Sequence, residues 1–189
     1  MTTLVMVEKD GEACIAAESL TSYGMMQLSA KYVENHEKIL RVGDAYLGFV
    51  GWSVNQTVME SVLASGLPLP EVRRDLDLFE FARKLHKKLK KEYFLNPRER
   101  GHLWEWSPMV LFLVNCHGLF ALYGDRCVEH NRRFAAVGSG SEYALGAMYA
   151  AYDLDLPVED VARIGVEAGT EFDESSQGPI TLKKVKLER

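Results

Sequence analysis

The chain opens with short apolar runs separated by polar turn residues. Asp10 and Gly11 follow the first run and form a strong signal for a hairpin turn. Residues 20–29 are more polar, with a turn expected at Gly24. A block of strands is therefore predicted at the start of the chain. The runs that predict these strands are residues 3–7, 13–17, 38–42 and 45–50.

Four helices are predicted in the later chain. Apolar residues recur at helical spacing in residues 76–94, and Ser53 is a plausible N-cap of the helix before it. Because strands come in blocks and do not alternate singly with helices, the pattern favours a layered α+β domain over a doubly wound sheet. The length of 189 residues suits one domain, residues 1–189. The predicted helices are residues 53–64, 76–94, 141–152 and 157–172, and the later strands are 108–115, 119–123, 133–138 and 180–185.

The composition narrows the classes of protein that fit. A formal net charge of −5 argues against nucleic acid as the main partner, and the longest apolar run, residues 109–114, is too short to cross a membrane. The start of the chain lacks the features of a secretory signal, so a cytoplasmic protein with reduced thiols is expected. Neither the cysteines nor the histidines show metal-type spacing, so no metal and no cofactor are predicted. These residues are Cys14, Cys116, Cys127, His36, His86, His102, His117 and His130.

Thr2 is the first candidate for chemistry. It becomes the first residue if Met1 is removed, and its small side chain permits that removal. A terminal threonine carries a hydroxyl nucleophile and its own α-amine, with an unperturbed pKa of about 7.7–8.0. Threonine activated by an N-terminal amine is a recognised solution to nucleophilic catalysis. An extended or acylated terminus would leave no free amine.

Charged residues at the ends of neighbouring strands supply partners for Thr2. Glu18 ends the second predicted strand and Lys38 begins the third, so both are candidates to project near Thr2 at one sheet end. An ammonium near the hydroxyl lowers its pKa, and a carboxylate orients the ammonium. Gly48 offers a backbone N–H where a substrate carbonyl can approach closely. Taken singly, each of these residues is more often a surface charge or a turn glycine.

Segments spread over nearly the whole chain resemble proteasome β-type subunits and the bacterial HslV peptidase, which belong to the N-terminal nucleophile hydrolase superfamily. Within it, the short chain without a propeptide resembles a bacterial proteasome homologue of the betaproteobacterial type. The resemblance implies a four-layer αββα sandwich, with two stacked antiparallel sheets between helix layers. The matching segments are Thr2-Thr3, Ile15-Ala16-Ala17-Glu18-Ser19, Lys38-Ile39, Gly48-Phe49-Val50-Gly51, Val137-Gly138-Ser139-Gly140 and Asp173-Glu174-Ser175-Ser176.

The resemblance also implies a role for each matched residue. Thr2 is expected to be the nucleophile, with Lys38 as the catalytic lysine and Glu18 as the acid beside it. The other matches are Gly48 for the oxyanion hole, Ser139, Asp173 and Ser176 around the terminal amine, Ser22 for substrate alignment, and Tyr46 and Val50 for the first specificity pocket.

One departure from the family pattern concerns the lysine. Glu18 and Lys38 lie 20 positions apart (38 minus 18), wider than the family spacing, and the extra length falls between Gly24 and His36. An ungapped count places Glu34 at the lysine position, which would abolish the mechanism. We prefer Lys38, because the segment that it begins continues directly into the next matching strand.

The function implied is a self-compartmentalising threonine peptidase that cleaves peptide bonds. Its subunits are expected to form a double ring of heptamers or hexamers, with an ATP-dependent unfoldase as a candidate partner. The alternatives are a ring scaffold that does not cleave peptides and an amidohydrolase for a small amide. Nucleotide binding at Gly138-Ser139-Gly140 is disfavoured, since Tyr143 stands where a third glycine is expected.

Overall fold

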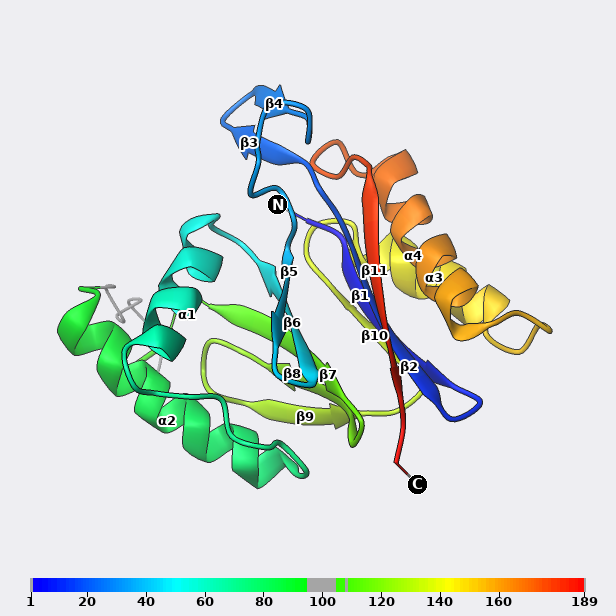
Figure 1. Ribbon diagram of the computed structural model, residues 1–189. Coiled ribbons are helices and arrows are strands. Elements are labelled where there is room, and N and C mark those ends of the chain that lie inside the picture. Colours follow the sequence, from blue (N-terminus) through cyan, green and yellow to red (C-terminus); the bar gives the residue numbers. More distant parts are fainter. Residues whose placement is uncertain (1, 95–104, 108, 189) are drawn as a thin grey trace.

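The computed structural model describes residues 2–94, 105–107 and 109–188 (Figure 1). Two antiparallel sheets and a short hairpin are flanked by helices, which confirms the predicted α+β class. The first sheet has the order β10 (Phe134–Val137), β1 (Leu4–Lys9), β2 (Glu12–Glu18) and β11 (Ile180–Lys186). The second has the order β5 (Ile39–Val42), β6 (Ala45–Val50), β7 (Val110–Asn115), β8 (Gly118–Leu122) and β9 (Val128–Asn131), and the hairpin pairs β3 (Thr21–Tyr23) with β4 (Met26–Leu28).

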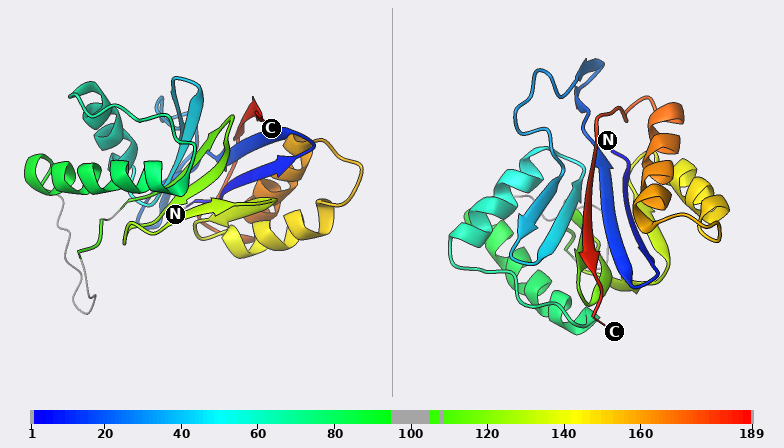
Figure 2. Two further views of the ribbon diagram at one scale, coloured as in Figure 1. Left: turned by 90° about the horizontal axis from the view of Figure 1, so that it is seen from below. Right: turned by 45° about the vertical axis from the view of Figure 1, so that its right-hand side comes forward.

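The helices lie on the outer sides of the two sheets, as Figure 2 shows. Helices α3 (Ser141–Ala151) and α4 (Val158–Phe172) contact the first sheet. Helices α1 (Val54–Ala64) and α2 (Asp75–Glu92) contact the second. Ser53 occupies the N-cap position predicted for α1, although it makes no side-chain capping hydrogen bond.

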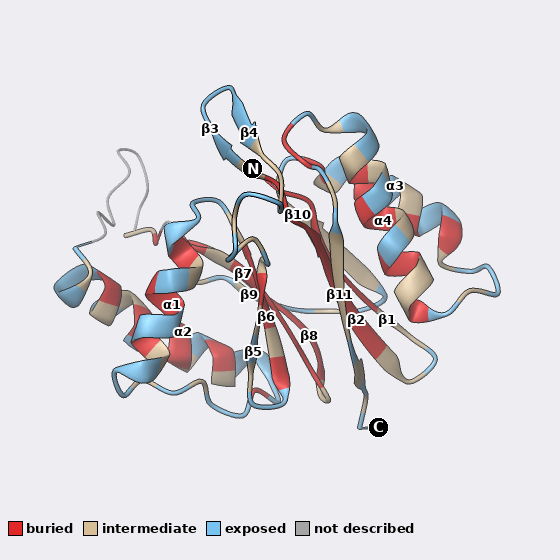
Figure 3. Cartoon of the chain, turned by 45° about the horizontal axis from the view of Figure 1, so that its top comes forward, coloured by how far each residue is buried: buried red, intermediate tan, exposed pale blue. Residues whose placement is uncertain are grey.

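Three clusters of buried apolar residues hold these elements together, and Figure 3 shows the buried strands and the inward faces of the helices. Strand β1 contributes to two of them. Leu4 and Met6 belong to the cluster between the sheets, and Val5 and Val7 belong to the cluster beneath α3 and α4. Because both faces of β1 are buried, its sequence is a continuous apolar run and not an alternating one.

The first hairpin determines where the chain begins in the fold. Asp10 and Gly11 have φ values of 51° and 81°, so both adopt the left-handed conformation that a tight hairpin turn requires. The resulting register sets Leu4 opposite Ala17 of β2 on one side and Val137 of β10 on the other. The start of β1 therefore lies between the ends of two neighbouring strands.

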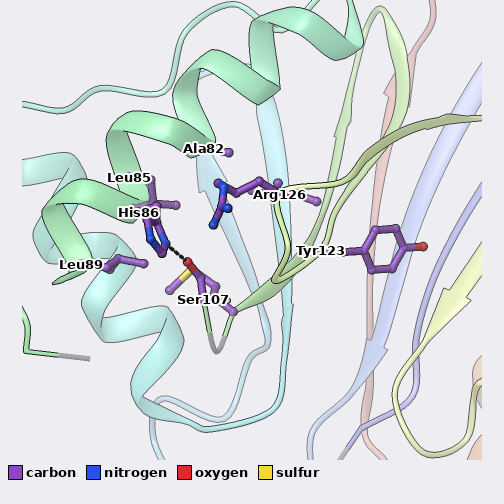
Figure 4. A pocket seen from close by; sticks show the side chains of 9 residues that line it. Ala82, Leu85, His86, Leu89, Ser107, Tyr123 and Arg126 are labelled. Carbon is purple, nitrogen blue, oxygen red and sulfur yellow. Dashed lines mark hydrogen bonds between the residues drawn. The ribbon is translucent and has the colours of Figure 1, made fainter. Parts of the chain in front are cut away.

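Two polar contacts of His86 connect helix α2 to residues 105–107, and Figure 4 shows the one with Ser107. His86 Nδ1 lies 2.6 Å from Ser107 Oγ, and His86 Nε2 lies 3.0 Å from a carboxylate oxygen of Glu105. Arg126 donates to the carbonyl of Glu105 at 2.6 Å. These contacts give His86 a structural partner on each ring nitrogen.

Within residues 2–94, 105–107 and 109–188, no helix combines the length and the apolar character needed to cross a membrane.

Candidate active site

Five segments of the chain meet at one end of the two sheets. Strand β1 starts there, β2 and β10 end there, β11 begins there, and the start of β5 approaches from the second sheet. Glu18 and Ile180 are directly opposite each other across β2 and β11. The strand ends therefore bring the predicted residues of both chain halves close to Thr2.

Thr2 and Lys38 are in direct contact. Lys38 Nζ donates a hydrogen bond to Thr2 Oγ1 at 3.1 Å and forms an ion pair with Glu18 Oε1. The side chain of Glu18 is 0% exposed and that of Lys38 is 17% exposed, so this pair is largely shielded from water. The structure thus places a shielded amine against the hydroxyl of Thr2.

The carboxylate of Glu18 is oriented by backbone groups. Its Oε2 accepts hydrogen bonds from the N–H of Leu20 at 2.6 Å and from the N–H of Gln177 at 3.2 Å. Because Oε2 is held in this way, Oε1 points at Lys38. Gln177, which the sequence analysis did not single out, therefore helps to position the lysine through Glu18.

The surroundings of Lys38 change its acidity. Burial disfavours the ammonium and lowers the pKa of Lys38 below its ordinary value, while the charges of Glu18 and Asp173 partly oppose the shift. A lysine with a lowered pKa is neutral more of the time at moderate pH and can then accept a proton. The contact with Thr2 Oγ1 makes that hydroxyl the nearest proton donor.

A second network of hydrogen-bonded polar side chains lies beside the backbone nitrogen of Thr2. That nitrogen donates to Ser139 Oγ at 3.3 Å, and Ser139 Oγ donates to Asp173 Oδ2 at 2.6 Å. Ser176 Oγ donates to the same carboxylate oxygen at 2.6 Å and lies 2.8 Å from Thr3 Oγ1. Thr3 is a member of this network that the sequence analysis did not assign.

Asp173 stays ionised within this group. Burial alone would raise its pKa, but hydrogen bonds from Ser139, Ser176 and the N–H of Ser175 outweigh burial, so the pKa of Asp173 is lowered. A carboxylate that accepts from two serine hydroxyls fixes the direction of both. The hydroxyl of Ser139 then presents its oxygen to the nitrogen of Thr2.

Gly138 allows the backbone of Thr2 to lie directly against the segment that carries Ser139. Its φ is 103°, and a Cβ at this position would lie 1.9 Å from the carbonyl oxygen of Thr2. Any side chain here would displace Thr2 from the group. The glycine of the Val137-Gly138-Ser139-Gly140 segment thus serves close packing of two backbones.

The structure distinguishes between the two possible alignments of the lysine. Lys38 contacts Thr2 and Glu18, whereas Glu34 is exposed on the connection between β4 and β5. The longer connection is accommodated before β5 begins, so the gapped alignment matches the geometry.

Gly48 does not occupy the position expected of it. Phe49 N donates to the carbonyl of Lys38 on β5 at 3.0 Å. Since N–H groups alternate in direction along a strand, the N–H of Gly48 points the other way, toward Phe112 of β7. A Cβ on Gly48 would lie 2.6 Å from Leu4 Cδ1, so the glycine permits the two sheets to approach. The expectation that Gly48 supplies the oxyanion N–H is not met by this geometry.

Tyr46 does not lie near Thr2, where the sequence comparison expected it to line the first specificity pocket. It lies opposite Arg41, near the start of β6, whereas Lys38 is beside the end of that strand. The four steps along the strand from Tyr46 to Val50 span about 13 Å, too far for Tyr46 to line a pocket at Thr2. Val50 ends β6 on the site side, and Ser22 is exposed on the β3–β4 hairpin.

Comparisons with known proteins place this geometry in a family. No protein-family model matches the chain. A structure of BPH from Thiobacillus denitrificans in complex with epoxomicin matches with a TM-score of 0.93 and 39% identity, over 99% of this chain and 100% of that chain. A second structure of the same BPH gives a TM-score of 0.92 and 38% identity, over 98% of each chain.

HslV from Trypanosoma brucei shares the fold, with a TM-score of 0.74 and 19% identity over 97% of this chain and 99% of that chain. The identity and coverage of the BPH matches confirm the resemblance found in the sequence. The chain therefore belongs to the bacterial proteasome homologue (BPH) family of proteasome-like and HslV-like N-terminal nucleophile hydrolases.

Proposed function

We propose that the chain is a proteasome-type threonine peptidase that cleaves peptide bonds with Thr2 once Met1 has been removed. The observation that carries this proposal is the double contact of Thr2: its hydroxyl accepts from Lys38, and its nitrogen donates to Ser139. A nucleophile and a proton acceptor within hydrogen-bonding distance are what covalent catalysis requires. The fold is then the four-layer αββα sandwich of this superfamily, in one domain.

The chemistry follows from these contacts. Neutral Lys38, or the freed amine of Thr2, takes the proton of Oγ1 as the oxygen attacks the carbonyl carbon of a peptide bond. The C–N bond then breaks, the leaving amine takes that proton, and the acyl group remains on Thr2 as an ester. Water hydrolyses the ester, which releases the carboxylic acid and restores the hydroxyl.

The developing oxyanion needs a donor other than Gly48. Gly51 follows the last residue of β6 and has a φ of 97°. By the alternation along the strand, its N–H points to the same side as that of Phe49, the side on which Lys38 lies. We therefore assign the oxyanion contact to the backbone near Gly51, with Val50 and Ser22 as candidates to contact the substrate.

Self-association is part of the proposal. Proteasome-type subunits form stacked rings that enclose their active sites, and we expect two heptamers or two hexamers here. An ATP-dependent unfoldase is the partner that such a chamber would use for folded substrates. We expect the assembly to work in the cytoplasm.

The two alternatives make different demands on the site. A ring scaffold needs no polar group at Thr2, yet Lys38, Glu18 and Asp173 are all oriented by hydrogen bonds. A small-amide amidohydrolase would use the same nucleophile on a short substrate. Hydrolysis of long peptides therefore separates the peptidase from both alternatives.

The experiment is hydrolysis of fluorogenic peptides and an unfolded polypeptide by the purified chain. We expect turnover that is inhibited by epoxomicin, the compound bound by the Thiobacillus BPH, and lost in Thr2→Ala. Thr57→Ala, on the exposed side of α1, is the matched control and should retain activity. Full activity in Thr2→Ala would disprove the proposal, and turnover of small amides alone would favour the amidohydrolase.

A further inference from the structure

A cluster of potential metal ligands lies at the other end of the molecule from Thr2. The turn between β7 and β8 carries Cys116 and His117, and the end of the chain places Glu188 beside them. One ligand atom from each residue lies within 4.8 Å of the other two. Figure 1 shows the C-terminus at the opposite end of the sheets from the N-terminus.

The turn that carries two of these residues is well ordered by hydrogen bonds. Asn115, which is 6% exposed, donates to the carbonyl of Val72 at 2.7 Å and accepts from the N–H of His117 at 2.9 Å. The N–H of Glu188 donates to the carbonyl of Cys116 at 2.8 Å. The side chain of Asn115 and one backbone hydrogen bond thus hold the main chain of Cys116, His117 and Glu188 close together.

The histidine is oriented by a carboxylate on its far side. His117 Nε2 lies 3.1 Å from Glu71 Oε1, and His117 Nδ1 faces Glu188 Oε2 at 4.0 Å. Glu71 also accepts from Arg73 at 2.7 Å. A carboxylate oxygen that already accepts from a guanidinium is an acceptor for the histidine as well, so Nε2 is the donor and Nδ1, on the side of Glu188, keeps its lone pair. A carboxylate behind a ligand histidine is the usual second contact in metal sites.

We propose that Cys116 Sγ, His117 Nδ1 and a carboxylate oxygen of Glu188 bind a divalent transition-metal ion, with Zn²⁺ as the best fit. Sulfur and imidazole ligands exclude Mg²⁺ and Ca²⁺, which select oxygen. Zn²⁺ takes this mixture of ligands in tetrahedral geometry, and water would complete the fourth position. The negative charges of a thiolate and of Glu188 balance the dication.

The bound ion would fasten the end of the chain to the β7–β8 turn. Glu188 follows β11, which pairs with β2 in the first sheet, whereas Cys116 and His117 belong to the second sheet. Metal binding would therefore link the two sheets at the end away from Thr2, and it takes no part in hydrolysis. Histidine spacing could not predict this site, because Glu188 lies 71 positions after His117 (188 minus 117).

The test is a titration of the purified, metal-free full-length chain with Co²⁺, followed by displacement with Zn²⁺. We expect one Co²⁺ per chain, a sulfur-to-cobalt charge-transfer band, and loss of that band when Zn²⁺ is added. Cys116→Ser should abolish the band, and Cys127→Ser, which changes an exposed cysteine elsewhere, should retain it. Glu71→Gln should weaken binding by roughly 10- to 100-fold, the usual effect of removing such a second contact.

Glu188→Gln serves as a second variant, because the side chain of Glu188 is 74% exposed and its replacement cannot unfold the protein. It should reduce the affinity for Co²⁺ and for Zn²⁺ together. Equal binding by Cys116→Ser and the unaltered chain, a band lost in Cys127→Ser, or no stoichiometric binding would each overturn the proposal. None of these results depends on peptide hydrolysis.

Discussion

Replacing Lys38 by methionine tests the central pair of the site. The substitution removes the ammonium but retains an unbranched side chain, so the packing around Thr2 changes little. What remains is the carboxylate of Glu18, with a side chain that is 0% exposed and no longer has its cation. We expect both stability and activity to fall, for separate reasons.

The loss of stability can be derived from the contacts of Glu18. Breaking a buried ion pair by removing one partner costs about 3–5 kcal/mol. Glu18 Oε2 retains the N–H groups of Leu20 and Gln177, which still stabilise the anion, so we expect the lower end, about 3 kcal/mol. Adding Glu18→Gln removes the unpaired charge, and the double variant should return to within about 1 kcal/mol of the unaltered chain.

Urea unfolding and peptide hydrolysis, measured at one chain concentration, separate the two effects. Activity should fall by about 10²- to 10⁴-fold in Lys38→Met and should not return in the double variant, since the proton acceptor is missing from both. Lys31→Met and Glu34→Ala, at exposed positions of the preceding connection, should leave both quantities unchanged. Unaltered stability in Lys38→Met, or activity restored in the double variant, would contradict the roles assigned to Lys38 as the partner of Glu18 and as the proton acceptor.

Three further predictions concern the surroundings of Thr2. Glu18→Gln removes the negative charge that raises the pKa of Lys38 most, so the acid limb of the pH–rate profile should move to lower pH. An acid limb that does not move would show that it does not report the titration of Lys38. Gly138→Ala should abolish the labelling of Thr2 by epoxomicin and lower the free energy of unfolding by about 1–3 kcal/mol. The control is Gly146→Ala, which has open space around it and should raise the free energy of unfolding by about 0.5–1 kcal/mol through α3. Because the pKa of Asp173 is lowered, its contribution to stability is complete above the ordinary carboxyl pKa and is lost as the pH falls through the lowered value. Asp173→Asn should therefore remove this part of the loss of stability in acid. It should also reduce activity by roughly 10- to 100-fold.

Much of the fold could be predicted because local pattern and tertiary packing agree. The predicted strand at residues 45–50 matches β6 (Ala45–Val50), and the predicted helix at 76–94 matches α2 (Asp75–Glu92) within two residues at each end. Strand β9 (Val128–Asn131) was not predicted. It is a partly exposed edge strand with two charged or polar exposed residues, so it lacks the apolar run that reveals a buried strand.

The active-site residues could be predicted best where the order of the strands determines which residues lie close together. The β1–β2 hairpin sets Glu18 beside the start of β1, so the proximity of Thr2 and Glu18 follows from the hairpin order. Lys38 precedes β5 of the second sheet, and it reaches Thr2 because the two sheets pack against each other. Gly48 and Tyr46 were misassigned because the direction of a backbone N–H and the distance along a strand depend on register, which the resemblance did not provide. Asp173 and Ser176 lie on a loop after α4, and only tertiary packing brings that loop to Thr2.

The most direct test of Thr2 as the nucleophile is a mass measurement on the protein isolated from its native host after treatment with epoxomicin. We predict a chain without Met1 that carries one adduct, mapped to Thr2, and no adduct in Thr2→Ala. A chain that retains Met1 yet hydrolyses peptides, or an adduct on any other residue, would contradict the claim that Thr2 is the nucleophile.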